Sequence, residues 1–243
     1  MNIWATTIIS TISYSIPFLL AGLGENVTEK AGVLNLGCEG MMLMGAVSGF
    51  LGTWFSGSFL VGLLFSGAMG VILGLLMAYM AVTRNANAVV SGLLIWLLGL
   101  GLANIIYQRA VGVRLILPTV EVGSRTEFLK LIPFLGPYLS KLNIMVYVAG
   151  ALVIGVYLFL FKTPIGLGIQ AVGENPLAAD TAGIDVVKTR YRALIIAGFL
   201  AGWAGATAVQ NNLKCIFSII CAKNNTPHHF GLKRPPWPCA TGE

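Results

Sequence analysis

Charged residues that could do chemistry are scarce in the apolar runs of this sequence. Glu39 is the single charged residue within residues 31–83, and Asn35 precedes it by four positions. If this run is one membrane helix, the two side chains lie on the same face. A carboxylate in a bilayer is costly, so such an acid either serves a proton or solute site or is held by a neighbouring helix. Asn35 and Glu39 are therefore candidates for a polar path through the membrane, and the structural interpretation stays open.

Residues suited to hydrolytic or metal chemistry lie near the C-terminal end. Both histidines, His228 and His229, follow the apolar runs, together with Cys215, Cys221 and Cys239. A Ser-His-Asp arrangement needs a histidine beside the nucleophile, and the cysteine and histidine spacings match no zinc-finger pattern. We expect no catalytic residues and no metal site in the apolar runs, so the chain is not predicted to be an enzyme.

Residues 162–192, between two apolar runs, contain two incomplete nucleotide motifs. Gly166, Gly168 and Ala171 match a dinucleotide fingerprint, but an apolar run precedes them where a strand is required. Val187 occupies the position of the glycine that a phosphate-binding loop needs before its lysine. The sequence therefore predicts no nucleotide site of its own.

The same segment carries the start and stop signals of a short helix. Asn175 can cap a helix that begins at Pro176, and Gly183 can end it in a left-handed conformation. Helices shorter than about 12 residues are marginal in water, so a helix of about seven residues must dock against something. It packs on its own bundle or is gripped by a partner protein, and both alternatives remain open.

The composition shows what kind of protein must position these residues. Of the 243 residues, 56% are hydrophobic and 10% are charged, and the mean hydropathy is +0.83. Soluble domains carry roughly 25% charged residues. A soluble enzyme and a nucleic-acid-binding module are therefore excluded, and the net charge of +6 comes from residues scattered at the ends of apolar runs.

The apolar runs predict an all-α, polytopic helical membrane protein. A spanning helix needs about 20 apolar residues, and lipid cannot satisfy an open strand edge. We expect about six transmembrane helices, near residues 3–23, 31–53, 59–83, 88–108, 143–161 and 192–210. Small residues recur four apart in three of these runs, which predicts close helix packing. The pairs are Gly45 and Gly49, Gly70 and Gly74, and Gly198 and Gly202.

Charge alone does not orient the chain. If residues 162–192 are cytoplasmic, six basic residues lie on that side and five on the other, and long loops follow the positive-inside rule weakly. The first set is Lys30, Arg84, Lys162, Lys188, Arg190 and Arg192, and the second is Arg109, Arg114, Arg125, Lys130 and Lys141.

Three blocks of sequence resemble one family of membrane proteins. They are GENVTEKAGVLNLGCEGMMLMGA at 24–46, NAVVSGLLIWLLGLGL at 87–102 and GIQAVGENPLAADTAGI at 168–184. Together they are similar to permease subunits of ABC importers for ribose-type sugars, nucleosides and branched-chain amino acids. The nucleoside branch is the most similar, and the resemblance covers roughly residues 3–208.

The resemblance implies a multi-pass subunit of a bacterial cytoplasmic membrane. Its expected partners are a second permease subunit, a cytoplasmic ATPase, an extracytoplasmic substrate-binding lipoprotein and membrane lipid. This chain would bind no cofactor, because the partner hydrolyses ATP. The short helix becomes the cytoplasmic coupling helix, and Asn35 and Glu39 belong to the translocation path. The residues expected to couple to the ATPase are Gly173, Glu174, Asn175, Pro176, Ala179, Asp180 and Gly183.

The predicted function is import of nucleosides or related simple sugars, with an ion-coupled secondary transporter using Glu39 as the alternative. We expect residues 1–210 to form the transmembrane domain, truncated relative to the family. Residues 211–243 are polar and proline-rich, and no run in them is long enough for a span. We expect a disordered tail or a reading-frame change there, with a natural lineage-specific tail as the alternative.

Overall fold

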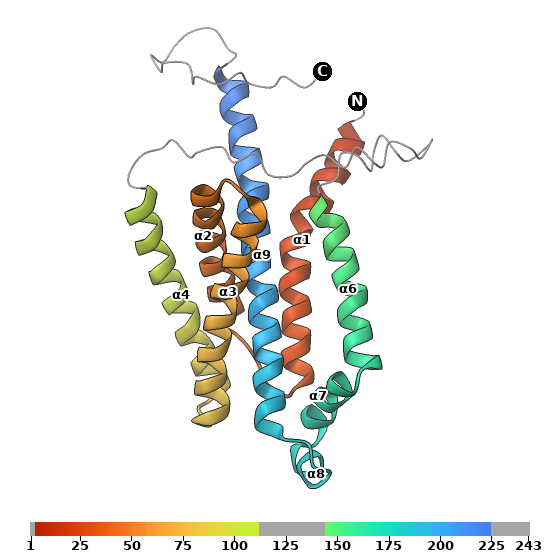
Figure 1. Cartoon of the computed structure of the whole chain (residues 1–243). Coiled ribbons are helices and arrows are strands. Elements are labelled where there is room, and N and C mark those ends of the chain that lie inside the picture. The colour runs from red at the N-terminus through yellow and green to blue at the C-terminus, as the bar shows by residue number, and fades with distance from the viewer. Residues whose placement is uncertain (1–2, 112–143, 225–243) are drawn as a thin grey trace.

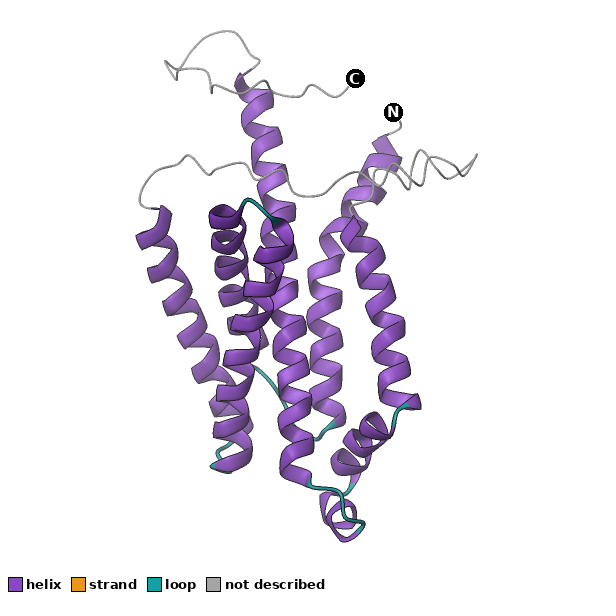
Figure 2. Ribbon diagram, viewed as in Figure 1, coloured by secondary structure: helices purple, strands orange, loops and turns teal. Residues whose placement is uncertain are grey.

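The computed structural model describes residues 3–111 and 144–224, and in these residues every regular element is a helix (Figure 2). The all-α prediction is confirmed. The elements are α1 Ile3–Lys30, α2 Cys38–Ser56, α3 Phe59–Ala78, the π-helical turn η1 Tyr79–Thr83, α4 Ala88–Val111, α6 Ile144–Lys162, α7 Pro164–Glu174, α8 Pro176–Thr181 and α9 Val186–Asn224.

Six long helices run side by side in one bundle (Figure 1). Helices α2, α3 and α9 pack together at its centre, while α4 lies at one edge and α6 at the other. The short helices α7 and α8 lie at one end, and α1 begins and α9 ends at the opposite end (Figure 1). Helix α8 therefore projects from one end of the bundle.

Four of the described helical stretches are long and apolar enough to cross a membrane: Phe59–Thr83, Ala88–Arg109, Met145–Lys162 and Val186–Val209. These correspond to four of the predicted spans. Helices α1 and α2 occupy the remaining two predicted positions, so six long helices form where the sequence indicated. That α1 and α2 also cross the bilayer stays a prediction.

Glycines allow the three central helices to approach closely, as their four-residue spacing predicted. A Cβ atom on Gly45 of α2 would lie 2.6 Å from the Cα atom of Gly202 in α9. One on Gly74 of α3 would lie 2.6 Å from the carbonyl oxygen of Leu194 in α9. Since carbon atoms pack at about 3.5–4.0 Å, these crossings have no room for a side chain.

One predicted boundary is wrong, because residues 31–37 form a break between two helices rather than the start of a span. Helix α1 continues to Lys30 and ends where Gly32 takes the left-handed φ of +73°. The amide of Val33 then donates to the carbonyl of Thr28 at 3.0 Å, which closes the helix end. The predicted span began at residue 31 because the run without charged residues begins there. The absence of charge does not indicate where a glycine ends a helix.

Helix α9 also differs from its predicted span, since it begins at Val186 and continues to Asn224. The backbone at 211–224 is therefore helical. Residues 225–243, with His228, His229 and Cys239, lie outside the described residues. The proposed division of the chain at residue 210 stays a prediction.

Candidate functional site

Helix α8 forms through the local signals that predicted it. The side chain of Asn175 accepts a hydrogen bond from the amide of Ala178 at 3.1 Å, and Pro176 takes the first helical position. At the other end Gly183 has a φ of +85°, and its amide donates to the carbonyl of Asp180 at 2.9 Å. The predicted short helix is confirmed, with six residues in place of about seven.

Helix α8 has one packed side and one exposed side. Ala179 is 4% exposed and faces the bundle, where α8 packs on α7 and α9. Leu177 is 81% exposed, and Asp180 and Glu174 are exposed as well. The helix thus docks on its own bundle and still offers a free face.

Helix α7 folds back against the end of α6. The hydroxyl of Thr163 accepts from the backbone amide of Gly166 at 3.1 Å, and the side-chain Nε2 of Gln170 donates to the carbonyl of Leu160 at 2.6 Å. Gly166 is buried, and a Cβ there would lie 2.6 Å from the Cα atom of Leu160. The glycines that formally matched a nucleotide fingerprint therefore lie in a helix, with Gly166 at a packing contact.

Asp185 caps the start of α9, which follows α8 in the chain. Its Oδ1 accepts from the amide of Lys188 at 3.0 Å, and its Oδ2 lies 2.9 Å from the Nζ of Lys188. The hydrogen bond from the Lys188 backbone, followed by the interactions with the Lys188 ammonium, lowers the pKa of Asp185. The carboxylate therefore stays ionised and caps α9 at neutral pH.

Gly173 lies at a contact between α7 and the end of α1. A Cβ there would lie 2.9 Å from the carbonyl carbon of Lys30 and 3.1 Å from the amide nitrogen of Gly32. On the other side, the Nε of Arg190 in α9 donates to the carbonyl of Ala31 at 3.4 Å. The first of the predicted coupling residues therefore packs against α1, away from the exposed face of α8.

Asn35 is paired differently from the prediction. It is 2% exposed in the break, and its backbone N–H donates to the Oε1 of Glu25 at 3.0 Å. Its own Oδ1 accepts from the amide of Gly37 at 3.2 Å. The Oε2 of Glu25 is buried and has no hydrogen-bond partner in the described part of the chain. Sequence reasoning missed Glu25, because a charge just after an apolar run is normally a flanking charge.

Glu39 does not pair with Asn35, because the two residues do not share a helix. Helix α2 begins at Cys38, so Glu39 lies in its first turn, where the helix dipole favours a carboxylate. Its side chain is exposed on this single chain. The expected continuous helix through Asn35 and Glu39 is therefore wrong, while a role of both residues in the translocation path stays a prediction.

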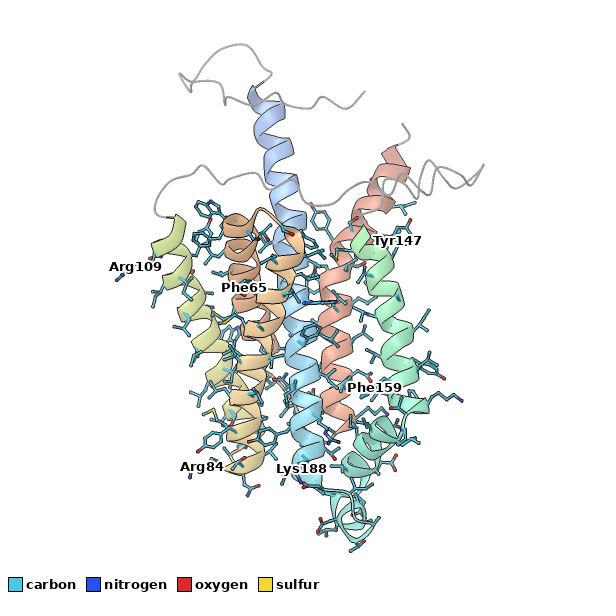
Figure 3. The ribbon with its side chains drawn as sticks, in the orientation of Figure 1. Phe65, Arg84, Arg109, Tyr147, Phe159 and Lys188 are labelled. Carbon is cyan, nitrogen blue, oxygen red and sulfur yellow. The ribbon has the colours of Figure 1, made fainter. Side chains whose placement is uncertain are left out.

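A cavity of about 450 Å³ lies between α2, α3 and α4. Phe65, which is labelled in Figure 3, is one of its lining residues. Its lining is apolar apart from Ser48 and Ser56, whose hydroxyls donate to carbonyls of their own helix. A site for a polar solute needs polar groups free to bind it. This cavity therefore does not fit a nucleoside or a sugar.

Basic residues of the described chain lie at both ends of the bundle. Arg84 and Lys188 lie at the end that carries α8, and Arg109 lies at the other (Figure 3). Lys30, Lys162, Arg190 and Arg192 share the first end. Of the set predicted for the opposite side, Arg114, Arg125, Lys130 and Lys141 lie outside the described residues.

Comparison with known proteins matches residues 7–216 to a family described as branched-chain amino acid transport system permease components. A putative glucose ABC transporter permease of Haloferax volcanii is 38% identical over 85% of this chain and 63% of its own length. A guanosine ABC transporter permease of Bacillus subtilis is 36% identical over 81% of this chain and 64% of its own length. A nucleoside ABC transporter permease of Lactococcus lactis is 30% identical over 86% of this chain and 69% of its own length. No solved structure matches the chain.

Proposed function

Because the chain belongs to the family of branched-chain amino acid transport system permease components, we propose that it is a membrane subunit of an ATP-driven importer. The proposed solutes are nucleosides or simple sugars, since the relatives above are named for guanosine, nucleosides and glucose. The chain spans somewhat less than two thirds of the length of the first two. Helix α8 is the structural observation that carries the proposal.

In this proposal α8 receives the movement of an ATPase. Its exposed Leu177 and the acidic residues beside it form the docking face, and Ala179 fixes the helix to the bundle. ATP is hydrolysed by the partner, so this chain contributes no nucleotide site. Closure of the ATPase then rocks packed helices against one another, which is a common form of alternating access.

In this proposal α8 faces the cytoplasm, where the ATPase would dock. Six basic residues lie at the α8 end, but the sequence carries four more at 112–143, so the orientation rests on the family and not on charge. The opposite end would then face a substrate-binding lipoprotein, and the membrane would be the bacterial cytoplasmic membrane. If α2 crosses the membrane, the exposed Glu39 favours a second permease subunit beside α2, because an acid facing lipid is costly.

Reconstitution tests the proposal against an ion-coupled transporter. The chain is placed in vesicles with its ATPase, second permease subunit and binding protein, and uptake of labelled guanosine is measured. We expect uptake to require ATP, to stop when the Walker A lysine of the ATPase is replaced, and to persist with a protonophore. Uptake driven by a proton gradient without the ATPase would overturn the assignment. Competition by glucose distinguishes the two solute classes.

A further inference from the structure

The backbone at the end of α1 is held between the Gly173 backbone of α7 and the Arg190 side chain of α9. Gly173 of α7 lies against Lys30 and Gly32, and Arg190 of α9 binds the carbonyl of Ala31. No side chain separates Gly173 from the α1 backbone. Because tightly packed groups transmit displacement with little loss, a movement of α7 must move the end of α1.

The break that follows is fixed at both of its sides. On the α1 side, Glu25 holds the amide of Asn35, whose side chain in turn holds the amide of Gly37. On the α4 side, a Cβ on Gly92 would lie 3.0 Å from the amide nitrogens of Leu36 and Gly37. Residues 31–37 thus lie between α1 and α4, with backbone atoms close to α4, directly before α2 begins.

We propose that residues 31–37 carry the movement of α7 and α8 into the bundle, and that Glu25 is the positioning residue that makes them move with α1; this rests on the proposed function. The two oxygens of Glu25 support the assignment. Oε1 ties the break to α1, and Oε2 is buried without a partner in the described residues. An unsatisfied buried oxygen raises the energy of this arrangement, which favours another in which a donor reaches it.

Cys38 is a natural reporter of this movement. It is the first residue of α2, directly after the break, and it is a half-buried free thiol. With Cys215, Cys221 and Cys239 replaced by serine, its modification by a membrane-permeant maleimide is measured at alkaline pH, because the thiolate is the reacting form and a half-buried thiol ionises reluctantly. A movement of the break that changes the exposure of Cys38 then changes this rate. We expect addition of ATPase and ATP to change that rate in the assembled transporter.

Two pairs of matched variants test the two contacts. Gly173→Ala places a methyl group against the α1 backbone, whereas Gly168→Ala on the same helix meets its nearest atom at 3.9 Å. Glu25→Ala removes the acceptor for Asn35, whereas Glu25→Gln keeps an oxygen there. Glu29→Gln, at an exposed acid one turn later, controls for the loss of charge.

In Glu25→Ala we expect the ATPase to bind as in wild type, because the α8 face is unchanged. Gly173 lies two residues before the cap of α8, so Gly173→Ala is assayed at saturating ATPase. Solute imported per ATP should fall by about fivefold or more, the usual range of coupling between sites. The ATP-dependent change at Cys38 should disappear in both variants and return in Glu25→Gln. Gly168→Ala and Glu29→Gln should match wild type in every measurement.

The outcomes separate this inference from the proposed function. If wild type imports guanosine with ATP but Gly173→Ala and Glu25→Ala import as much per ATP, the transmission through residues 31–37 is wrong and the function stands. If the wild-type assembly imports no solute, yet Cys38 responds to ATP and Gly173→Ala abolishes the response, the proposed function fails and the transmission stands. A Cys38 rate that never responds to ATP in a transporting assembly also overturns the inference.

Discussion

Leu177 gives the most direct quantitative test of the proposed docking face. Its side chain is 81% exposed, and full burial of a leucine contributes about 1.5–3 kcal/mol. If the ATPase covers it, replacement by alanine, which keeps the Cβ, should cost about 1–2 kcal/mol of binding free energy. Because each 1.4 kcal/mol is a factor of ten, the Kd for the ATPase should rise by about 5- to 30-fold.

The measurement is a titration of fluorescently labelled ATPase onto the chain in lipid nanodiscs. Alanine is a strong helix former and the site is exposed, so α8 and the fold should survive the substitution. Leu177→Met is the matched control, because it keeps an apolar side chain of similar volume. We expect Leu177→Met to bind as wild type and ATP-driven uptake to fall with affinity in Leu177→Ala.

A Leu177→Ala variant whose Kd equals that of wild type would refute the docking face. So would a Leu177→Met variant that binds as weakly as Leu177→Ala, since the loss would then come from α8 itself. Either result would leave the family assignment intact. It would move the ATPase contact to another part of the α8 end.

The helix crossings, the α8 stop and Glu39 yield three further predictions. Gly45→Ala should destabilise the protein by about 1–3 kcal/mol relative to Gly155→Ala, because its new methyl group meets Gly202 whereas Gly155 has open space; thermal unfolding in detergent measures the difference, and equal midpoints contradict the packing. Gly183→Val should weaken ATPase binding and uptake while preserving membrane insertion, since a φ of +85° strains a β-branched residue by about 1–2 kcal/mol or more. Gly183→Asn should weaken ATPase binding less than Gly183→Val does. ATPase binding at wild-type strength in Gly183→Val would contradict the predicted strain. Glu39→Gln should preserve uptake if the acid is only a hydrogen-bond partner; a wild-type pH dependence that vanishes in the variant would instead support ion coupling.

Signals close together in the chain were sufficient to predict much of this protein. Runs without charge located six helices, because burying peptide groups in an apolar medium requires each to be hydrogen-bonded within the segment. Asn175, Pro176 and Gly183 predicted α8, because their capping hydrogen bonds and dihedral preferences act over three or four residues. The four-residue spacing of glycines predicted close packing, although not which helices would meet.

Only the tertiary structure decided what the polar residues do. Glu25 and Asn35 meet across a reversal of the chain, which exists because Gly32 ends α1 against α7 and α9. Asn35 and Glu39 are separated for the same reason, since a helix begins between them. The exposure of Leu177 likewise depends on which side of α8 packs on the bundle. Sequence spacing determines neighbours within one helix, whereas contacts across a break depend on how distant helices pack together.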